Sequence, residues 1–145
     1  MRLGSLASAR PQYYDRNAIG IANSNSQNIT GNTTTVFTMY TVPAGKKFIL
    51  SLLAMEFFNN AVMTGAGAYV SGYWQVTFAS PVSTSTIAFA RFAKTAVGDE
   101  QWHGVSPAMA LNAGDILKFT AQGTPLITAA NVSVLGSIGG TEFDA

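Results

Sequence analysis

The sequence contains no cysteine and very few charged side chains. The absence of cysteine from 145 residues excludes disulfide bonds and thiolate metal sites. Asp, Glu, Lys and Arg make up 10% of the chain and leave a net charge of +1, whereas an ordinary soluble domain has about 25% charged residues. The eight Lys and Arg residues are spread along the chain and form no basic cluster. We therefore expect no nucleic-acid partner.

Long hydrophobic runs are also missing. The most apolar stretch, Phe48–Phe58, is much shorter than the roughly 18–20 residues that a membrane-spanning helix requires. The first ten residues contain Arg2 and several small residues but no apolar run of the kind found in secretory signals. We expect neither a membrane partner nor a cleaved signal.

The residues available for catalysis are few, with one histidine and seven carboxylates in the whole chain. The richest cluster is Asp99–His103, which has three potential ligands within five residues, but its spacing is not that of the helical zinc motif with two histidines four apart. We interpret it as a solvated loop with Trp102 packed at its base. Because no serine lies in a nucleophile-elbow pattern, we expect no enzyme activity and no cofactor.

Apolar residues, in contrast, account for 48% of the chain. Few charges and many apolar residues indicate more apolar surface than one small domain covers by itself, which favours an oligomer. The alternative is a monomer whose surface is solvated by the hydroxyls and amides of Ser, Thr and Asn.

The N-terminal residues 1–34 are predicted to form an arm and a polar linker, and residues 35–145 a single β-sandwich domain. Residues 1–20 show neither helical nor strand periodicity. Residues 23–35 are almost entirely polar, so they offer little apolar area to offset the entropy of ordering, and we allow only a short strand around Ala18–Ala22.

The arm carries the residue types that anchor protein interfaces. Arginine presents a planar set of donors, and tyrosine and arginine are enriched among interface hot spots. The candidate partner-binding residues are Arg2, Arg10, Tyr13, Tyr14 and Arg16. The alternative is a disordered tail whose composition is incidental.

From Thr35 onward the hydrophobic pattern has a period of two, and β-branched and aromatic residues dominate between turn signals. The alanine-rich segment 84–96 also tolerates a helix, but its alternation favours a strand. The pattern predicts seven or eight strands, namely Val36–Val42, Lys47–Phe58, Tyr69–Phe78, Ser85–Lys94, Ala108–Leu111, Ile116–Ala121 and Thr128–Ile138, with the short strand at Ala18–Ala22 as an eighth. Short strands without amphipathic helices predict an all-β sandwich or barrel.

Two details of this arrangement are predicted. The turn Pro43-Ala44-Gly45 is expected to close a hairpin between its flanking strands, because proline fixes φ and glycine supplies a positive φ. The stretch Phe48–Phe58 is apolar at both alternating sets of positions, which is typical of a central strand. One of its faces is expected to meet the core and the other a neighbouring molecule.

Two turns carry a resemblance. Tyr40–Phe48 (YTVPAGKKF) and Leu111–Phe119 (LNAGDILKF) are similar to the turns that open an early hairpin and a late strand in small jelly-roll proteins of phage particles. Together with the arm and the low charge, they make the chain resemble the decoration (cement) proteins of tailed-phage heads. Similar turns also occur in phage fibre tips and in trimeric domains of the complement C1q and tumour-necrosis-factor families.

The resemblance implies an all-β, jelly-roll-like antiparallel sandwich or barrel of about eight strands with an extended N-terminal arm. It further implies a homotrimeric virion protein on the capsid surface, whose partners are the major capsid protein and other copies of itself. Two alternatives remain open. One is a carbohydrate- or receptor-binding module of a phage fibre or tip, using Tyr69, Tyr73, Trp74 or Trp102 to stack on a glycan. The other is a small capsid shell subunit.

Overall fold

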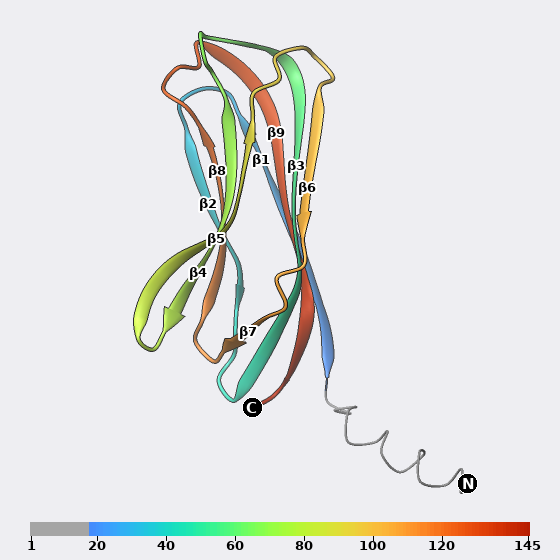
Figure 1. The fold of residues 1–145 in the computed structure, drawn as a ribbon, viewed down its shortest axis with the longest axis vertical. Coiled ribbons are helices and arrows are strands. Elements are labelled where there is room, and N and C mark those ends of the chain that lie inside the picture. The colour runs from blue at the N-terminus through green and yellow to red at the C-terminus, as the bar shows by residue number, and fades with distance from the viewer. Residues whose placement is uncertain (1–17) are drawn as a thin grey trace, which may run out of the picture.

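The computed structural model describes residues 18–145, and all of the regular structure in this range is β-strand (Figure 1). This range therefore contains no helix that would cross a membrane. The nine strands are β1 (Ile19–Ile29), β2 (Thr34–Thr41), β3 (Lys46–Thr64), β4 (Val70–Ala79), β5 (Val82–Phe92), β6 (Glu100–Val105), β7 (Met109–Asn112), β8 (Ile116–Gly123) and β9 (Ala129–Asp144).

The strands form two antiparallel sheets that face each other. Sheet A has the order β1-β9-β3-β6, with β7 also paired to β3, and sheet B has the order β2-β8-β4-β5. Because β6 and β7 both pair with β3, they occupy one strand position. The strands pair from the two ends of the chain inward, with β1 on β9, β2 on β8, β3 on β6 and β7, and β4 on β5. This is the winding of a jelly roll. The prediction of an all-β antiparallel sandwich is confirmed.

The core lies between the inner faces of the two sheets. Phe57 of sheet A stacks on Phe92 of sheet B with ring centroids 5.5 Å apart, and Trp74 packs against Phe119 at 4.9 Å within sheet B. Strand β5 spans most of the segment for which a helix was the alternative, so the strand prediction is confirmed there. Its inward residues Ala90 and Phe92 are buried.

Strand β1 corrects the prediction of a polar linker. All eleven of its residues pair with β9, from Ile19 opposite Glu142 to Ile29 opposite Val132. Nearly every side chain of β1 is exposed or half-buried, and only Ile29 at its end is fully buried. The strand is therefore held at the edge of the sheet by its backbone hydrogen bonds to β9. Because its side chains are not buried, its sequence shows no hydrophobic alternation. The sandwich begins at Ile19 and not at residue 35.

The turn at Pro43-Ala44-Gly45 corrects the predicted hairpin. Gly45 does adopt the expected positive φ, of 74°. However, β2 belongs to sheet B and β3 to sheet A, so the turn carries the chain between sheets and does not close a hairpin. The backbone of Val42 instead forms hydrogen bonds with the turn between β7 and β8. Its carbonyl accepts from Gly114 N at 2.9 Å, and its amide donates to Asp115 O at 3.0 Å.

Asp115 fixes this pair of turns. Its side chain is buried, with one carboxylate oxygen accepting from Asn112 N at 2.8 Å and the other from Ala79 N at 2.9 Å. The carboxylate thus closes its own turn and joins it to the end of β4.

We expect Asp115→Ala to lower the free energy of unfolding by about 3 kcal/mol, because two backbone amides lose a charged acceptor. Asp115→Asn retains one acceptor oxygen and is expected to lose about half as much. Urea unfolding of both variants checks this order, and an unchanged stability for Asp115→Ala would contradict the role of the carboxylate.

The two sheets are also linked by a polar contact at the end where β1 begins. The Tyr40 hydroxyl of β2 donates to the carboxylate of Glu142 in β9, and Lys46 Nζ lies 3.9 Å from the same carboxylate. Burial of Tyr40, followed by its hydrogen bond to Glu142 and the negative charge there, raises the pKa of the phenol well above its ordinary value.

A raised pKa in the folded state means that this contribution to stability is complete below pH 10 and is lost as the pH rises toward the folded-state pKa. We expect the unfolding free energy of the parent protein to fall more steeply above pH 10 than that of Tyr40→Phe. Denaturant titrations between pH 8 and pH 11 measure the two slopes, and equal slopes would exclude the effect.

Candidate interaction surface on sheet A

The outer face of sheet A is the surface that β3 turns away from the core. Alternation along β3 directs Phe48, Leu50 and Phe57 inward, with a register shift between Leu50 and Leu52. The outward positions carry large apolar side chains that remain exposed, which are Leu52 (41%), Phe58 (44%) and Val62 (55%). One face of this strand thus meets the core as expected, and contact of the other face with a neighbouring molecule stays a prediction.

Two aromatic rings and two carboxylates lie together on this face, where β3 pairs with the edge strand β6. Glu56 of β3 is paired with Trp102 of β6, and Phe58 is paired with Glu100. Paired residues lie on the same side of a sheet with Cβ atoms about 5 Å apart, and the two pairs follow each other along the strands. The four residues thus form an alternating square, which we call the β3–β6 quartet. All four are exposed.

The indole of Trp102 lies over Gly104, two residues further along β6. A Cβ atom at Gly104 would come within 2.1 Å of the Trp102 ring, so glycine is required for this ring position. Ala54, the partner of Gly104 across the ladder, is only 8% exposed although it is on the outer face. Trp102 itself is 61% exposed. A broad apolar ring is thus held against the sheet with much of its surface free.

The same region is hollowed. An open depression of about 460 Å³ is lined by Glu56, Phe57, Phe58, Glu100, Gln101 and Trp102. All four members of the β3–β6 quartet are among these residues. The hollow therefore offers aromatic surface and carboxylate oxygens together.

The carboxylates of the quartet differ from the other acids of residues 18–145. Asp99 accepts from Ala96 N, Asp115 from two amides, Glu142 from Tyr40, and Asp144 forms an ion pair with Lys46. Within the described part of the chain, Glu56 and Glu100 are the two carboxylates whose side chains take part in no hydrogen bond or ion pair. The nearby Lys94 directs its Nζ to the backbone carbonyl of Glu100, at 2.7 Å.

Strand β6 corrects the interpretation of Asp99–His103. The segment Glu100–Val105 is a strand and not a loop, and Trp102 is exposed and not packed at a base. Alternation turns Glu100 and Trp102 outward, whereas Gln101 and His103 contact each other and His103 meets the buried Phe57 edge-on. The candidate ligands therefore diverge, and residues 18–145 contain no group of three that would hold a metal ion.

The predicted arm residues Arg2, Arg10, Tyr13, Tyr14 and Arg16 lie outside the described residues. Their role in partner binding stays a prediction.

The four aromatic residues named for glycan stacking differ in how accessible their rings are to a ligand. Trp74 is completely buried and is unavailable to a ligand. Tyr69 is covered by the guanidinium of Arg91, which lies 3.8 Å from the ring centroid, and Tyr73 is half-buried beside the exposed Phe89 across the ladder. Trp102 is the exposed tryptophan. The pattern in the sequence marked it as aromatic but did not separate it from Trp74, because only the strand assignment of β6 shows its direction.

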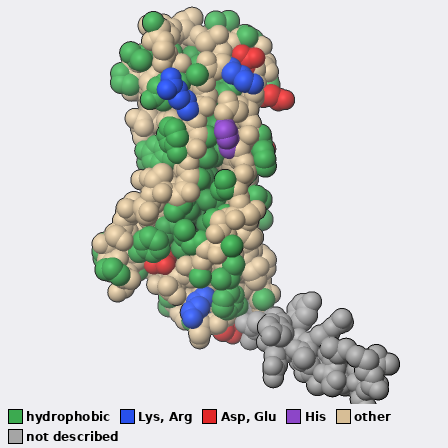
Figure 2. All heavy atoms as spheres, in the orientation of Figure 1, with side chains coloured by type: hydrophobic (Ala, Val, Ile, Leu, Met, Phe, Trp, Pro, Cys, Tyr) green, Lys and Arg blue, Asp and Glu red, His purple; other side chains and the backbone are tan. Residues whose placement is uncertain are grey.

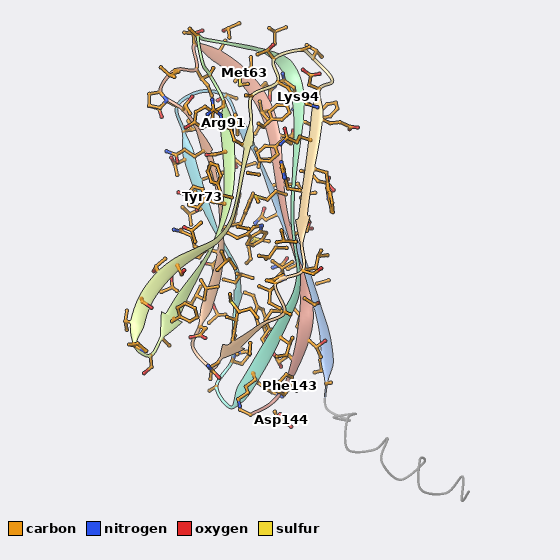
Figure 3. All side chains as sticks on the ribbon, in the orientation of Figure 1. Met63, Tyr73, Arg91, Lys94, Phe143 and Asp144 are labelled. Carbon is orange, nitrogen blue, oxygen red and sulfur yellow. The ribbon has the colours of Figure 1, made fainter. Side chains whose placement is uncertain are left out.

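Charged side chains are sparse on the face drawn in Figure 2, where hydrophobic side chains run in a band along its middle. Figure 3 places Arg91 and Lys94 toward one end of the sandwich and Phe143 and Asp144 at the opposite end. The β3–β6 quartet belongs to the Lys94 end, because Lys94 binds the backbone of Glu100.

No protein-family model matches the chain, and no curated protein matches its sequence. Similar solved structures include the Eiger TNF of S. frugiperda, at 12% identity and a TM-score of 0.48, covering 85% of this chain and 92% of that one. They also include Desmodium yellow mottle tymovirus (9%, 0.40, covering 91% and 90%) and a pentameric capsid protein from metagenomic phage sequences (20%, 0.30, covering 77% and 60%). Viral capsid proteins are thus among the structural neighbours. With TM-scores below 0.5 these likenesses carry no argument about function, and the jelly roll is established by the strand order.

Fluorescence quenching can test the assignment of Trp102 as exposed and Trp74 as buried. In dilute protein we expect acrylamide to quench the Trp102 emission and to leave that of Trp74 nearly untouched. Relative to free tryptophan, caesium ion is expected to quench Trp102 more and iodide less, because Glu56 and Glu100 attract cations. Trp102→Phe should remove the quenchable fraction, and equal quenching of that variant and the parent would contradict the assigned exposure.

Proposed function

We propose that the protein is a structural protein of a virion, a homotrimer that decorates the outer surface of a capsid and reinforces it. The observation that carries the proposal is the outer face of sheet A, where Leu52, Phe58 and Trp102 are exposed on one side of a sandwich that has few charges. Exposed apolar surface of this kind is typical of protein–protein contact sites. In this proposal the partners are other copies of the chain and the major capsid protein.

The contacts made by the described carboxylates support a binding role and not a catalytic one. Asp99 and Asp115 serve as caps for backbone amides, and Glu142 and Asp144 form contacts that hold the ends of strands. Each of these groups is explained by the fold. Glu56 and Glu100 remain, and each is paired across the β3–β6 ladder with an exposed aromatic residue.

Sedimentation equilibrium of the purified chain tests the oligomer. Three chains of 15.2 kDa give a particle of about 46 kDa. We expect Phe58→Ser to lower the trimer fraction, because it removes apolar area from the contact face. Val82→Ser is the matched control, because Val82 is 83% exposed at the turn between β4 and β5, away from sheet A. A parent protein that stays at 15.2 kDa at all concentrations would overturn the proposal.

Co-sedimentation with capsids tests the decoration role. The chain is expected to bind shells assembled from the major capsid protein of the same virus and to raise the temperature at which they break open. Electron microscopy of the chain by itself is expected to show no closed particles. Shells formed by the chain alone would identify it as a capsid subunit instead.

A second candidate function, glycan binding, is favoured by one specific feature. The flat ring of Trp102 lies against the sheet beside Glu56, and a ring flanked by polar acceptors is suited to stacking on a sugar. A glycan array separates the two functions. Signals that disappear in Trp102→Ala would support the receptor-binding module, and an array without signals would leave assembly as the function.

A further inference from the structure

We infer that the β3–β6 quartet is the docking site for the N-terminal segment, residues 1–17, of a second copy of the chain. The inference rests on the proposed function, because it names the contact by which copies are tied together.

The charges of the two partners are opposite. Residues 1–17 contain Arg2, Arg10 and Arg16 against Asp15, a net charge of +2, and the remaining residues contain five Lys and Arg against six acids, a net charge of −1. These values add to the +1 of the whole chain. The quartet itself contributes two of the six acids, and they are the two that have no partner within residues 18–145.

The side chains of the two partners also match. An arginine placed over Trp102 or Phe58 gains a cation–π contact, and its guanidinium reaches the adjacent carboxylate with two parallel hydrogen bonds. The alternation of ring and carboxylate in the quartet offers this combination twice, at Trp102 with Glu56 and at Phe58 with Glu100. Residues 10–16 supply two arginines, and between them Tyr13 and Tyr14. The tyrosine rings lie in the hollow between the two arginine positions, against its aromatic lining residues.

Distance separates Tyr13, Tyr14 and Arg16 from the chain's own quartet. Ile19 pairs with Glu142, which pairs with Phe48, so β1 begins at the level of Phe48 on sheet A. Phe58 lies ten residues further along β3, or about 30 Å at roughly 3.3 Å per residue. Tyr13 is six residues before Ile19, which allows a span of about 20 Å when fully extended. Tyr13, Tyr14 and Arg16 therefore fall short, so docking of residues 10–16 as a unit requires the quartet of a neighbour.

The view in Figure 1 agrees with this separation. The strand β1 begins at the end of the sandwich where the C-terminus lies, whereas β6 begins near the opposite end. Docking of the segment between copies thus links the lower end of one molecule to the upper part of the next.

Reciprocal charge reversal in the full-length chain tests the inference. One variant carries Arg10→Glu with Arg16→Glu, and the other carries Glu56→Arg with Glu100→Arg. Each variant alone places like charges together, so we expect association at least about tenfold weaker than in the parent. An equimolar mixture presents an acidic segment to a basic quartet. In a mixed trimer two of the three contacts then join opposite charges, so the mixture is expected to recover part of the association, with both variants present in the same particle by native mass spectrometry.

Two further variants separate the quartet from general effects of charge and folding. Gly104→Ala changes no charge but forces Trp102 off the sheet, and is expected to weaken association. Thr84→Arg with Thr86→Arg adds positive charge at exposed positions of β5 in sheet B, away from the quartet, and is expected to leave association unchanged. Thermal unfolding confirms that each variant is folded before its association is compared.

The outcomes distinguish the inference from the proposed function. If both reversed variants assemble as the parent does, or if folded variants fail to recover association on mixing, the docking site is wrong while the trimer stands. If the parent protein itself never associates, the proposed function fails first. If the quartet variants assemble normally but lose signals on a glycan array, the quartet is a sugar site and the inference is overturned.

Discussion

The alternation of side chains along β3 is the constraint on which the rest of the structure depends. This strand lies between β9 and the β6–β7 position, so its two faces have separate tasks. The inward positions, such as Phe48 and Phe57, close the core against sheet B. Several outward positions, among them Leu52, Phe58 and Val62, are also apolar, and they remain exposed within residues 18–145. In a two-layer sandwich no third layer covers such side chains.

How far the sequence predicts the fold depends on how each strand is stabilised. Strands β3, β4 and β8 bury alternate side chains, so their hydrophobic pattern located them within a few residues. Strand β1 is held by its backbone ladder and buries only Ile29 fully, so its polar sequence was interpreted as a linker. Strand β6 was missed because its residues Glu100 and Gln101 look like a solvated loop. The local pattern also could not predict that β2 and β3 belong to different sheets, because a Pro-Ala-Gly turn is equally suited to a hairpin and to a connection between sheets.

The candidate site was predictable only in part, for the same physical reason. The sequence indicated that Phe48–Phe58 has a second apolar face, and the structure places Leu52 and Phe58 there. The quartet, however, depends on the register between β3 and β6, which pairs Glu56 with Trp102 across almost fifty residues of chain. No local signal specifies that pairing. Gly104 is the one residue that hints at it, because a side chain at this position would displace the indole.

The account is tested most directly by measuring how accessible Trp102 is as the protein associates. Hydroxyl-radical footprinting across a concentration series reports oxidation at Trp102 and, as an internal reference, at the exposed Val82. If a second copy covers the outer face of sheet A, oxidation of Trp102 falls as the assembled fraction rises while that of Val82 stays constant. Equal oxidation of Trp102 in the monomer and in the assembled particle would contradict the central claim.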